Sequence, residues 1–184
     1  VLDVEMSLES YNPTDGARKI EGFVDGLSNW YVRRSRRRFW KSENDTDKLS
    51  AYHTLYHCLV TVAKLLAPFT PFLAEELYRN LVGTFFPEYP LSVHLSDFPT
   101  ADVGLIDKRL SEDIRLAMKL SSMGRSARSK AGIKVRQPLD VNYVSLASEP
   151  EREAVQRIGP SVMEELNIKK LQVIDDMSRL DENH

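Results

Sequence analysis

Arginine and lysine side chains are concentrated in two stretches of the sequence that contain no acidic residue. Within residues 30–41 the basic residues are Arg33, Arg34, Arg36, Arg37, Arg38 and Lys41. Within residues 115–139 they are Arg115, Lys119, Arg125, Arg128, Lys130, Lys134 and Arg136. A guanidinium group stays charged at cellular pH and donates two parallel hydrogen bonds to a phosphate. Although the formal net charge is only -2, both stretches therefore indicate surfaces that follow a phosphate backbone.

Aromatic residues lie among the arginines of the first stretch. They are Trp30, Tyr31, Phe39 and Trp40. Such rings offer stacking surfaces to unstacked bases, the usual way in which proteins read single-stranded RNA. The alternative is that the rings belong to the core of a helical bundle, in which the arginines pair with carboxylates of neighbouring helices. Both uses are compatible with the residue types.

The spacing of apolar residues before this stretch predicts the helix that positions it. Apolar side chains recur every three or four residues from about Ala17 onward, at Ile20, Phe23, Val24, Leu27, Trp30 and Tyr31. The same stripe continues to Arg34 and Arg38, which need carboxylates or phosphates as partners. Helical spacing therefore favours a structural role for Trp30, Arg34 and Arg38, and Trp40 stays open between a structural and an RNA-binding role. The residues that point away from the stripe, and that we expect to bind RNA, are Arg33, Arg36 and Arg37.

The second basic stretch has two possible uses. It could be the solvated face of a helix and a hairpin, which is the common fate of scattered charges. The absence of acidic residues instead favours sequence-independent contact with phosphates. On that interpretation the RNA-binding residues are Arg125, Arg128, Lys134 and Arg136.

The remaining pattern predicts a mainly α fold with a small α/β module at its end. Helices are expected over residues 49–66, 72–81 and 107–131, with a polar loop over 42–46 and a long connection over 83–100. Beyond Gly132 the period changes to alternation, so strands are expected at 139–143 and 171–174. Between them lies a helix with a capping box at Ser148 and Glu151 and a break at Gly159-Pro160. Residues 1–131 and 132–184 are the two expected domains, with a polar tail from Asp175.

Several classes of protein and of site are disfavoured by composition. The single cysteine, Cys58, cannot form an internal disulfide or hold a zinc ion alone. His53 and His57 lie four residues apart beside it, but helix packing explains this spacing better than a metal site. No apolar stretch approaches the ~20 residues that a membrane span needs, and we expect a cytoplasmic protein without a membrane partner. Residues 1–9 read as the end of a longer helix, which predicts that the chain is truncated at its N-terminus.

Four segments of the sequence carry a resemblance to a known family. Residues 27–40, with the sequence Leu-Ser-Asn-Trp-Tyr-Val-Arg-Arg-Ser-Arg-Arg-Arg-Phe-Trp, resemble the isoleucyl-tRNA synthetases, which are class I aminoacyl-tRNA synthetases. Residues 66–77, 131–139 and 165–170 agree in order and spacing. The Ala-Pro-Phe and Glu-Glu-Leu of the second segment are shared among related synthetases, whereas Lys-Val-Arg-Gln-Pro-Leu in the third is more specific. Together the four segments cover nearly the whole chain.

The resemblance implies a tRNA-binding role without a catalytic site. It implies a helical anticodon-binding domain over residues 1–131 and a small α/β junction module after it. The parent enzyme would be an isoleucine–tRNA ligase, an ATP- and Mg-dependent enzyme whose catalytic and editing domains come earlier, and the RNA partner would be tRNA(Ile). The family's His-Ile-Gly-His-like and Lys-Met-Ser-Lys-Ser-like signatures are absent, so no catalytic residue, cofactor or metal is assigned to this chain. The alternatives are a piece of a valyl or leucyl synthetase, and a helical protein-interaction scaffold without an RNA role.

Overall fold

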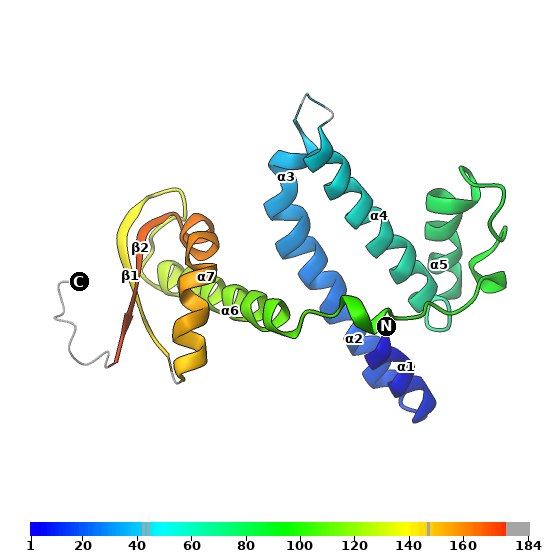
Figure 1. The fold of residues 1–184 in the computed structure, drawn as a ribbon, viewed down its shortest axis with the longest axis horizontal. Coiled ribbons are helices and arrows are strands. Elements are labelled where there is room, and N and C mark those ends of the chain that lie inside the picture. Colours follow the sequence, from blue (N-terminus) through cyan, green and yellow to red (C-terminus); the bar gives the residue numbers. More distant parts are fainter. Residues whose placement is uncertain (42, 44, 147, 176–184) are drawn as a thin grey trace. The chain divides into compact units, whose positions relative to one another are not determined.

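The computed structural model of the chain describes residues 1–41, 43, 45–146 and 148–175 (Figure 1). The chain folds into two compact units, Val1–Val103 and Gly104–His184. The boundary expected from the sequence, between residues 131 and 132, lies at the end of a helix that the structure includes in the second unit. The predicted polar tail beyond Asp175, and Ser42 and Asn44 of the predicted polar loop, lie outside the described residues.

The first unit is helical throughout its regular structure. Its elements are α1 (Leu2–Glu9), α2 (Pro13–Gly26), η1 (Leu27–Val32), α3 (Arg33–Phe39), α4 (Thr46–Leu66), α5 (Pro71–Tyr78), η2 (Arg79–Gly83) and η3 (Val93–Leu95), and a short turn η4 (Val103–Leu105) begins at its end. The α2, η1 and α3 segments follow one another without a gap and form one long rod, along which α4 returns (Figure 1). Asn12 caps the start of the rod by accepting a hydrogen bond from the Asp15 backbone N–H at 3.2 Å. The rod therefore begins at Pro13, earlier than the predicted Ala17.

The rod contains a π-helical turn that the sequence pattern does not reveal. Over Leu27–Val32 the turn is wider than that of an α-helix, so the face that packs on α4 changes its phase. Beyond this turn Ser35 and Phe39 are buried, one position away from the predicted Arg34 and Arg38. Before it, Phe23 and Val24 of the predicted stripe are 49% and 41% exposed, so neighbouring helices cover this part of the stripe only partly.

Two apolar clusters hold the first unit together. One joins α1, α2 and α4 through Val4, Ile20 and Leu65. The other joins α4, α5 and the following connection, and its buried members are Ala63, Ala74, Tyr78, Val82 and Val93. Glu75 secures this connection, because its carboxylate accepts hydrogen bonds from the Ser92 hydroxyl at 2.8 Å and the Val93 N–H at 3.0 Å. The Ser92 hydrogen bond is the main reason why the pKa of Glu75 lies below its ordinary value.

The second unit is a helical pair beside a two-stranded parallel sheet. Its elements are α6 (Lys108–Lys130), β1 (Leu139–Ser145), α7 (Glu149–Leu166) and β2 (Ile168–Ile174). The register of the sheet pairs Leu139 with Ile168 and Ser145 with Ile174. Parallel strands need a crossover connection, and α7 supplies it (Figure 1).

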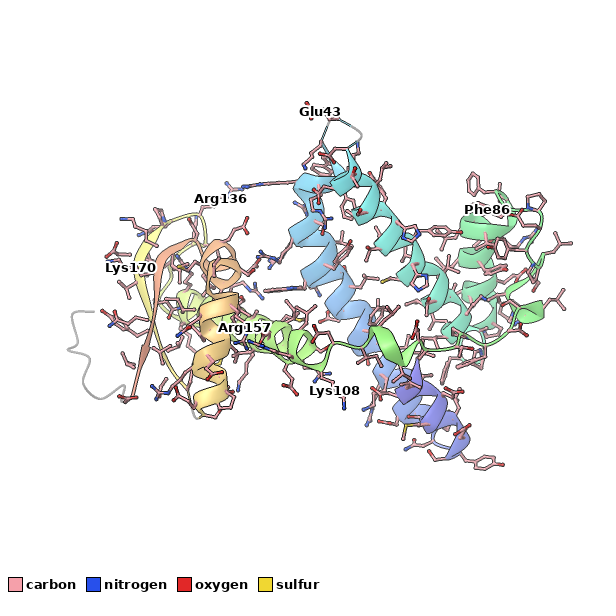
Figure 2. The ribbon with its side chains drawn as sticks, viewed as in Figure 1. Glu43, Phe86, Lys108, Arg136, Arg157 and Lys170 are labelled. Carbon is pink, nitrogen blue, oxygen red and sulfur yellow. The ribbon has the colours of Figure 1, made fainter. Side chains whose placement is uncertain are left out.

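An ion pair and a close approach join α6 to α7. Arg157, labelled in Figure 2, donates from Nε and Nη2 to the two carboxylate oxygens of Asp113 at 2.7 and 2.8 Å. This bidentate pair lowers the pKa of Asp113, chiefly through the hydrogen bonds themselves. Gly124 of α6 faces Leu166 of α7, where no side chain would fit without a shift. The two helices are therefore fixed both by charge and by shape.

Two local predictions for α7 are wrong. The helix continues through Gly159-Pro160 without the predicted break. Pro160 removes the hydrogen bond to the Gln156 carbonyl, but both residues are exposed, so water can replace that bond. Ser148 is the N-cap residue as predicted, yet its side chain makes no capping hydrogen bond.

Candidate nucleic-acid interface

The first predicted basic segment lies where the rod ends and α4 begins. The acidic residues that α4 carries in this region are Asp45, its N-cap, and Asp47, in its first turn. Asp45 accepts a hydrogen bond from the Lys48 N–H at 2.8 Å, and this bond is the main cause of its lowered pKa. An acidic first turn also complements the partial positive charge of the helix N-terminus. The start of α4 is thus a negatively charged site opposite the arginines.

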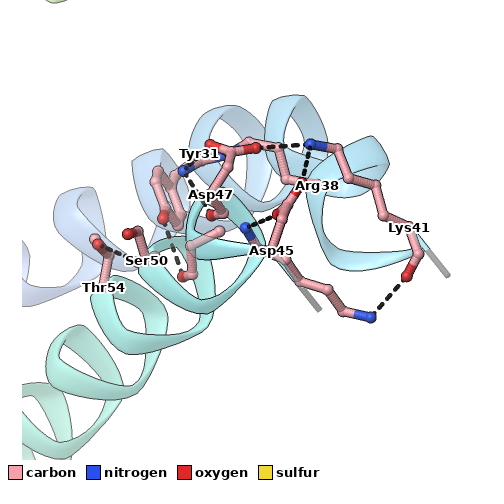
Figure 3. Close-up of polar contacts among 9 residues, drawn as sticks. Tyr31, Arg38, Lys41, Asp45, Asp47, Ser50 and Thr54 are labelled. Atoms are coloured by element: carbon pink, nitrogen blue, oxygen red, sulfur yellow. Dashed lines mark hydrogen bonds and ion pairs between the residues drawn. The ribbon is translucent and has the colours of Figure 1, made fainter. Parts of the chain in front are cut away.

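These carboxylates neutralise part of the basic segment (Figure 3). Arg38 donates from Nε to Asp47 Oδ1 at 2.8 Å and from Nη2 to the Asp47 carbonyl at 3.1 Å. Lys41 Nζ lies 3.0 Å from Asp47 Oδ2 and 3.2 Å from Asp45 Oδ2. The hydrogen bond from Arg38 is the leading reason why the pKa of Asp47 is lowered. Arg38 therefore has a carboxylate partner, although the packed face beyond the π turn runs through Ser35 and Phe39.

An aromatic cluster fastens α3 onto α4 just below these ion pairs. The Phe39 ring lies 5.0 Å from that of Tyr52 and 6.4 Å from that of Tyr31, measured between centroids. The Tyr31 hydroxyl donates to the Ala51 carbonyl at 3.1 Å, and the Tyr52 hydroxyl donates to the Phe39 carbonyl at 3.3 Å. Tyr31 and Phe39 therefore serve the packing of the hairpin.

The outward side of the rod's end carries the residues that we call the tip surface: Arg36, Arg37 and Trp40. Trp40 is 77% exposed, and the Arg36 guanidinium carbon stands 5.6 Å from the centroid of its ring. Such a cation–π contact pre-orients both side chains. Arg37 is exposed, and its side chain makes no hydrogen bond or ion pair with another residue of the described ranges. The tip surface therefore offers two cations and one large ring to a ligand.

The other predicted residues of this segment are less available. The Arg34 guanidinium carbon stands 5.2 Å from the centroid of the Trp30 ring, which is half-buried. Arg33 is exposed, but neither Arg33 nor Arg34 is without a partner. The predicted RNA-binding role of Arg33 stays a prediction.

The four predicted RNA-binding residues of the second basic segment divide into two inward-facing and two outward-facing side chains. Arg125 Nη1 lies 2.6 Å from Glu165 Oε1, so this arginine joins α6 to α7. Arg128 is only 5% exposed and donates to three backbone carbonyls, those of Lys134, Gln137 and Asn167. These positions explain both arginines as parts of the fold, and burial turns Arg128 away from solvent. Lys134 and Arg136, by contrast, are exposed.

Lys134 and Arg136 lie on a turn between α6 and β1, residues 133–137, which we call the clamped loop; Arg136 is labelled in Figure 2. Gly132, at φ +68°, ends α6 with the pair of bonds typical of a Schellman motif, Gly132 N–H to Ser129 carbonyl at 3.1 Å and Ile133 N–H to Arg128 carbonyl at 2.9 Å. Asn167, which sequence reasoning missed, donates from Nδ2 to the carbonyls of Val135 and Arg136 at 3.1 Å each. An asparagine directly after an apolar helix is a signal of a left-handed C-terminal cap, and Asn167 has φ 52° and ψ 54°.

Other features of the described residues lie outside the two basic segments. A cleft of about 480 Å³ lies between α6 and α7, but its charged lining includes the paired Asp113 and Arg157. Cys58 is half-buried, and burial raises the pKa of its thiol. Within the part of the chain that is described, no three histidine, cysteine, aspartate or glutamate side chains gather as metal ligands. No helix of that part is long and apolar enough to span a membrane.

Comparison with known proteins gives consistent matches. A family model described as the anticodon-binding domain of tRNA ligase matches residues 1–143. The chain is 64% identical over 173 residues to an isoleucine–tRNA ligase of Dehalococcoides mccartyi, 48% identical over 173 residues to one of Thermus thermophilus, and 46% identical over 179 residues to one of Clostridium novyi. These alignments cover 94%, 94% and 97% of the chain but 17% of each relative.

Proposed function

We propose that this chain, which belongs to the family of anticodon-binding domains of tRNA ligases, docks the anticodon arm of tRNA(Ile). In this proposal it works as part of a longer isoleucine–tRNA ligase, whose other domains join isoleucine to the tRNA with ATP and Mg. The observation that carries the proposal is the tip surface. There, Arg36, Arg37 and Trp40 face outward while the neighbouring Arg38 and Lys41 are held by carboxylates.

The neighbouring acidic residues do not neutralise the positive charge of the tip surface, because they pair with other basic residues. Asp47 is engaged by Arg38 and Lys41 in direct ion pairs, so it does not compete for Arg37. Arg36 and Arg37 would then contact phosphates, and the exposed ring of Trp40 would stack on a base of the anticodon loop. A stacked base gains about 1–3 kcal/mol from such a contact.

The contribution of this chain to the reaction would be placement of the substrate. Holding the anticodon arm fixes where the distant acceptor end lies, and correct placement replaces part of the entropy cost of bringing the reacting groups together. No acid, base or nucleophile of this chain is needed for that role. The similarity to isoleucine–tRNA ligases supports tRNA(Ile) rather than a valine or leucine tRNA as the partner.

A binding titration at several salt concentrations tests the proposal. The triple variant Arg36→Ala/Arg37→Ala/Trp40→Ala is compared with the double variant Arg18→Ala/Lys19→Ala, which removes two exposed cations elsewhere on the rod. Loss of two phosphate contacts lowers the slope of log K against log salt by about 1.4, and loss of the stacked ring adds to the fall in affinity. Thermal stability should change by less than about 0.5 kcal/mol, because all three side chains are exposed.

The same titration separates this proposal from a protein-interaction scaffold. A scaffold for acidic partners would bind polyglutamate as tightly as tRNA(Ile) at equal charge concentration. The proposal expects tRNA(Ile) to bind more tightly, and it fails if the triple variant and the control variant lose affinity equally.

A further inference from the structure

We propose that Arg128 and Asn167 are positioning residues that hold the clamped loop as a preformed phosphate-binding turn, which presents Lys134 and Arg136 to the RNA backbone. The inference rests on the proposed function, since it assigns a second RNA contact to the same chain. All of its residues belong to the second unit, whereas the tip surface belongs to the first.

The two clamp side chains engage the carbonyl groups of residues 134–137. Arg128 Nη1 donates to the carbonyls of Lys134 and Gln137 at 3.1 and 3.0 Å, and Asn167 Nδ2 donates to those of Val135 and Arg136. Four consecutive carbonyls therefore turn toward the clamp. An anion that approaches the other side of the loop does not meet their partial negative charge.

The remaining donors of the loop are available to a ligand. The backbone N–H groups of Lys134, Val135 and Arg136 donate no hydrogen bond to any residue of the described ranges. The side chains of Lys134 and Arg136 are exposed and form no ion pair within those ranges. Successive unused backbone donors beside two cations have the composition of a phosphate-binding turn.

Arg128 adds a third positive charge beneath the loop. Its guanidinium is buried, and its partners are carbonyl groups rather than carboxylates. A buried charge without a counter-charge is destabilising, and carbonyl groups supply only partial negative charge. An anion bound on the loop would supply the missing counter-charge.

Asn167 contributes more than a left-handed backbone conformation, because its side-chain amide also donates hydrogen bonds to the clamped loop. Its left-handed φ of 52° is a conformation that glycine adopts without strain. Glycine would, however, lose both bonds to the loop. Asn167→Gly is therefore a variant that keeps the cap of α7 and releases one half of the clamp.

The test compares tRNA(Ile) binding by the 184-residue chain and four variants across a range of salt concentrations. Lys134→Ala/Arg136→Ala should lose about 25-fold in affinity at 0.1 M salt, and its salt slope should fall by about 1.4. Asn167→Gly should lose about twofold to tenfold, the cost of ordering the loop on binding. In a chain that already carries Lys134→Ala/Arg136→Ala, Asn167→Gly should cause a much smaller further loss, because only the backbone donors of the loop remain to be ordered. Arg128→Lys keeps the charge but cannot reach three carbonyls, and it should resemble Asn167→Gly.

Two results would overturn the inference. One is an equal loss from Asn167→Gly with and without Lys134 and Arg136, which would mean that the clamp acts only through the fold. The other is unchanged binding in Lys134→Ala/Arg136→Ala while the tip variant still loses affinity, which would remove the loop as a contact and leave the proposed function standing. If the unaltered chain bound no tRNA(Ile), the proposed function itself would fail.

Discussion

Replacing Gly124 by alanine tests how closely α6 and α7 are packed. An added Cβ would lie 2.8 Å from Leu166 Cδ2 and closer still to Cδ1, and Leu166 is only 1% exposed. Overpacking of this kind costs about 1–3 kcal/mol. Alanine also favours a helix over glycine by about 1 kcal/mol, which offsets part of the cost.

Gly22→Ala is the control for helix propensity, because Gly22 is exposed inside α2 and an added Cβ there meets no atom within 4 Å. The gain in helix propensity is the same at both positions. Gly22→Ala should therefore stabilise its own unit by about 1 kcal/mol, while the effect of Gly124→Ala on the second unit should fall about 1–3 kcal/mol short of that gain.

Urea denaturation followed by circular dichroism measures both differences. For a unit of this size, 1 kcal/mol corresponds to about 4–8 °C in Tm, so a thermal scan would also resolve them. Because Leu166 directly precedes Asn167, Gly124→Ala should weaken tRNA binding as well. An equal gain in stability from the two alanine substitutions would refute the packing argument.

The remaining predictions concern pH and the full-length ligase. The pKa of Asp113 and that of Glu75 lie below their ordinary values in the folded chain. On acidification the unfolded chain therefore binds protons before the folded chain does. The free energy of unfolding should be constant from pH 7 to about pH 5 and should fall as the pH drops below about 4. Denaturation at several pH values checks this, and Asp113→Asn should reduce the pH dependence of the second unit. In a complete isoleucine–tRNA ligase, Arg36→Ala/Arg37→Ala should leave amino-acid-dependent ATP–pyrophosphate exchange unchanged and lower tRNA aminoacylation, since only the second step uses the anticodon arm. A parallel fall in both activities would show that these arginines support the enzyme's architecture.

Apolar spacing predicts the helices of this chain well, because burial of one face dominates where a helix packs. It predicts α4, α6 and the change to strands after Gly132, and the fold class is confirmed. It fails after residue 32, where Ser35 and Phe39 are buried in place of Arg34 and Arg38, because the π turn at Leu27–Val32 changes the phase of the rod and leaves no mark in residue spacing.

The basic segments show a different limit of sequence reasoning. Charge identifies the segments, but it does not tell which cation meets an internal acceptor. Arg38 pairs with Asp47 because α4 begins opposite the end of α3 in the folded chain. Arg128 and Asn167 are far apart in the sequence and come together only in the folded second unit. Their hydrogen bonds to the clamped loop therefore could not be predicted from residue spacing.

Footprinting of tRNA(Ile) bound to the 184-residue chain tests the central claim most directly. Hydroxyl-radical cleavage of the bound tRNA should be reduced in the anticodon arm and unchanged at the acceptor end. The triple variant of Arg36, Arg37 and Trp40 should lose protection in the anticodon loop under conditions where the Arg18/Lys19 control retains it. Protection of the acceptor end, or no protection when the chain is saturating, would contradict the claim that this chain docks the anticodon arm.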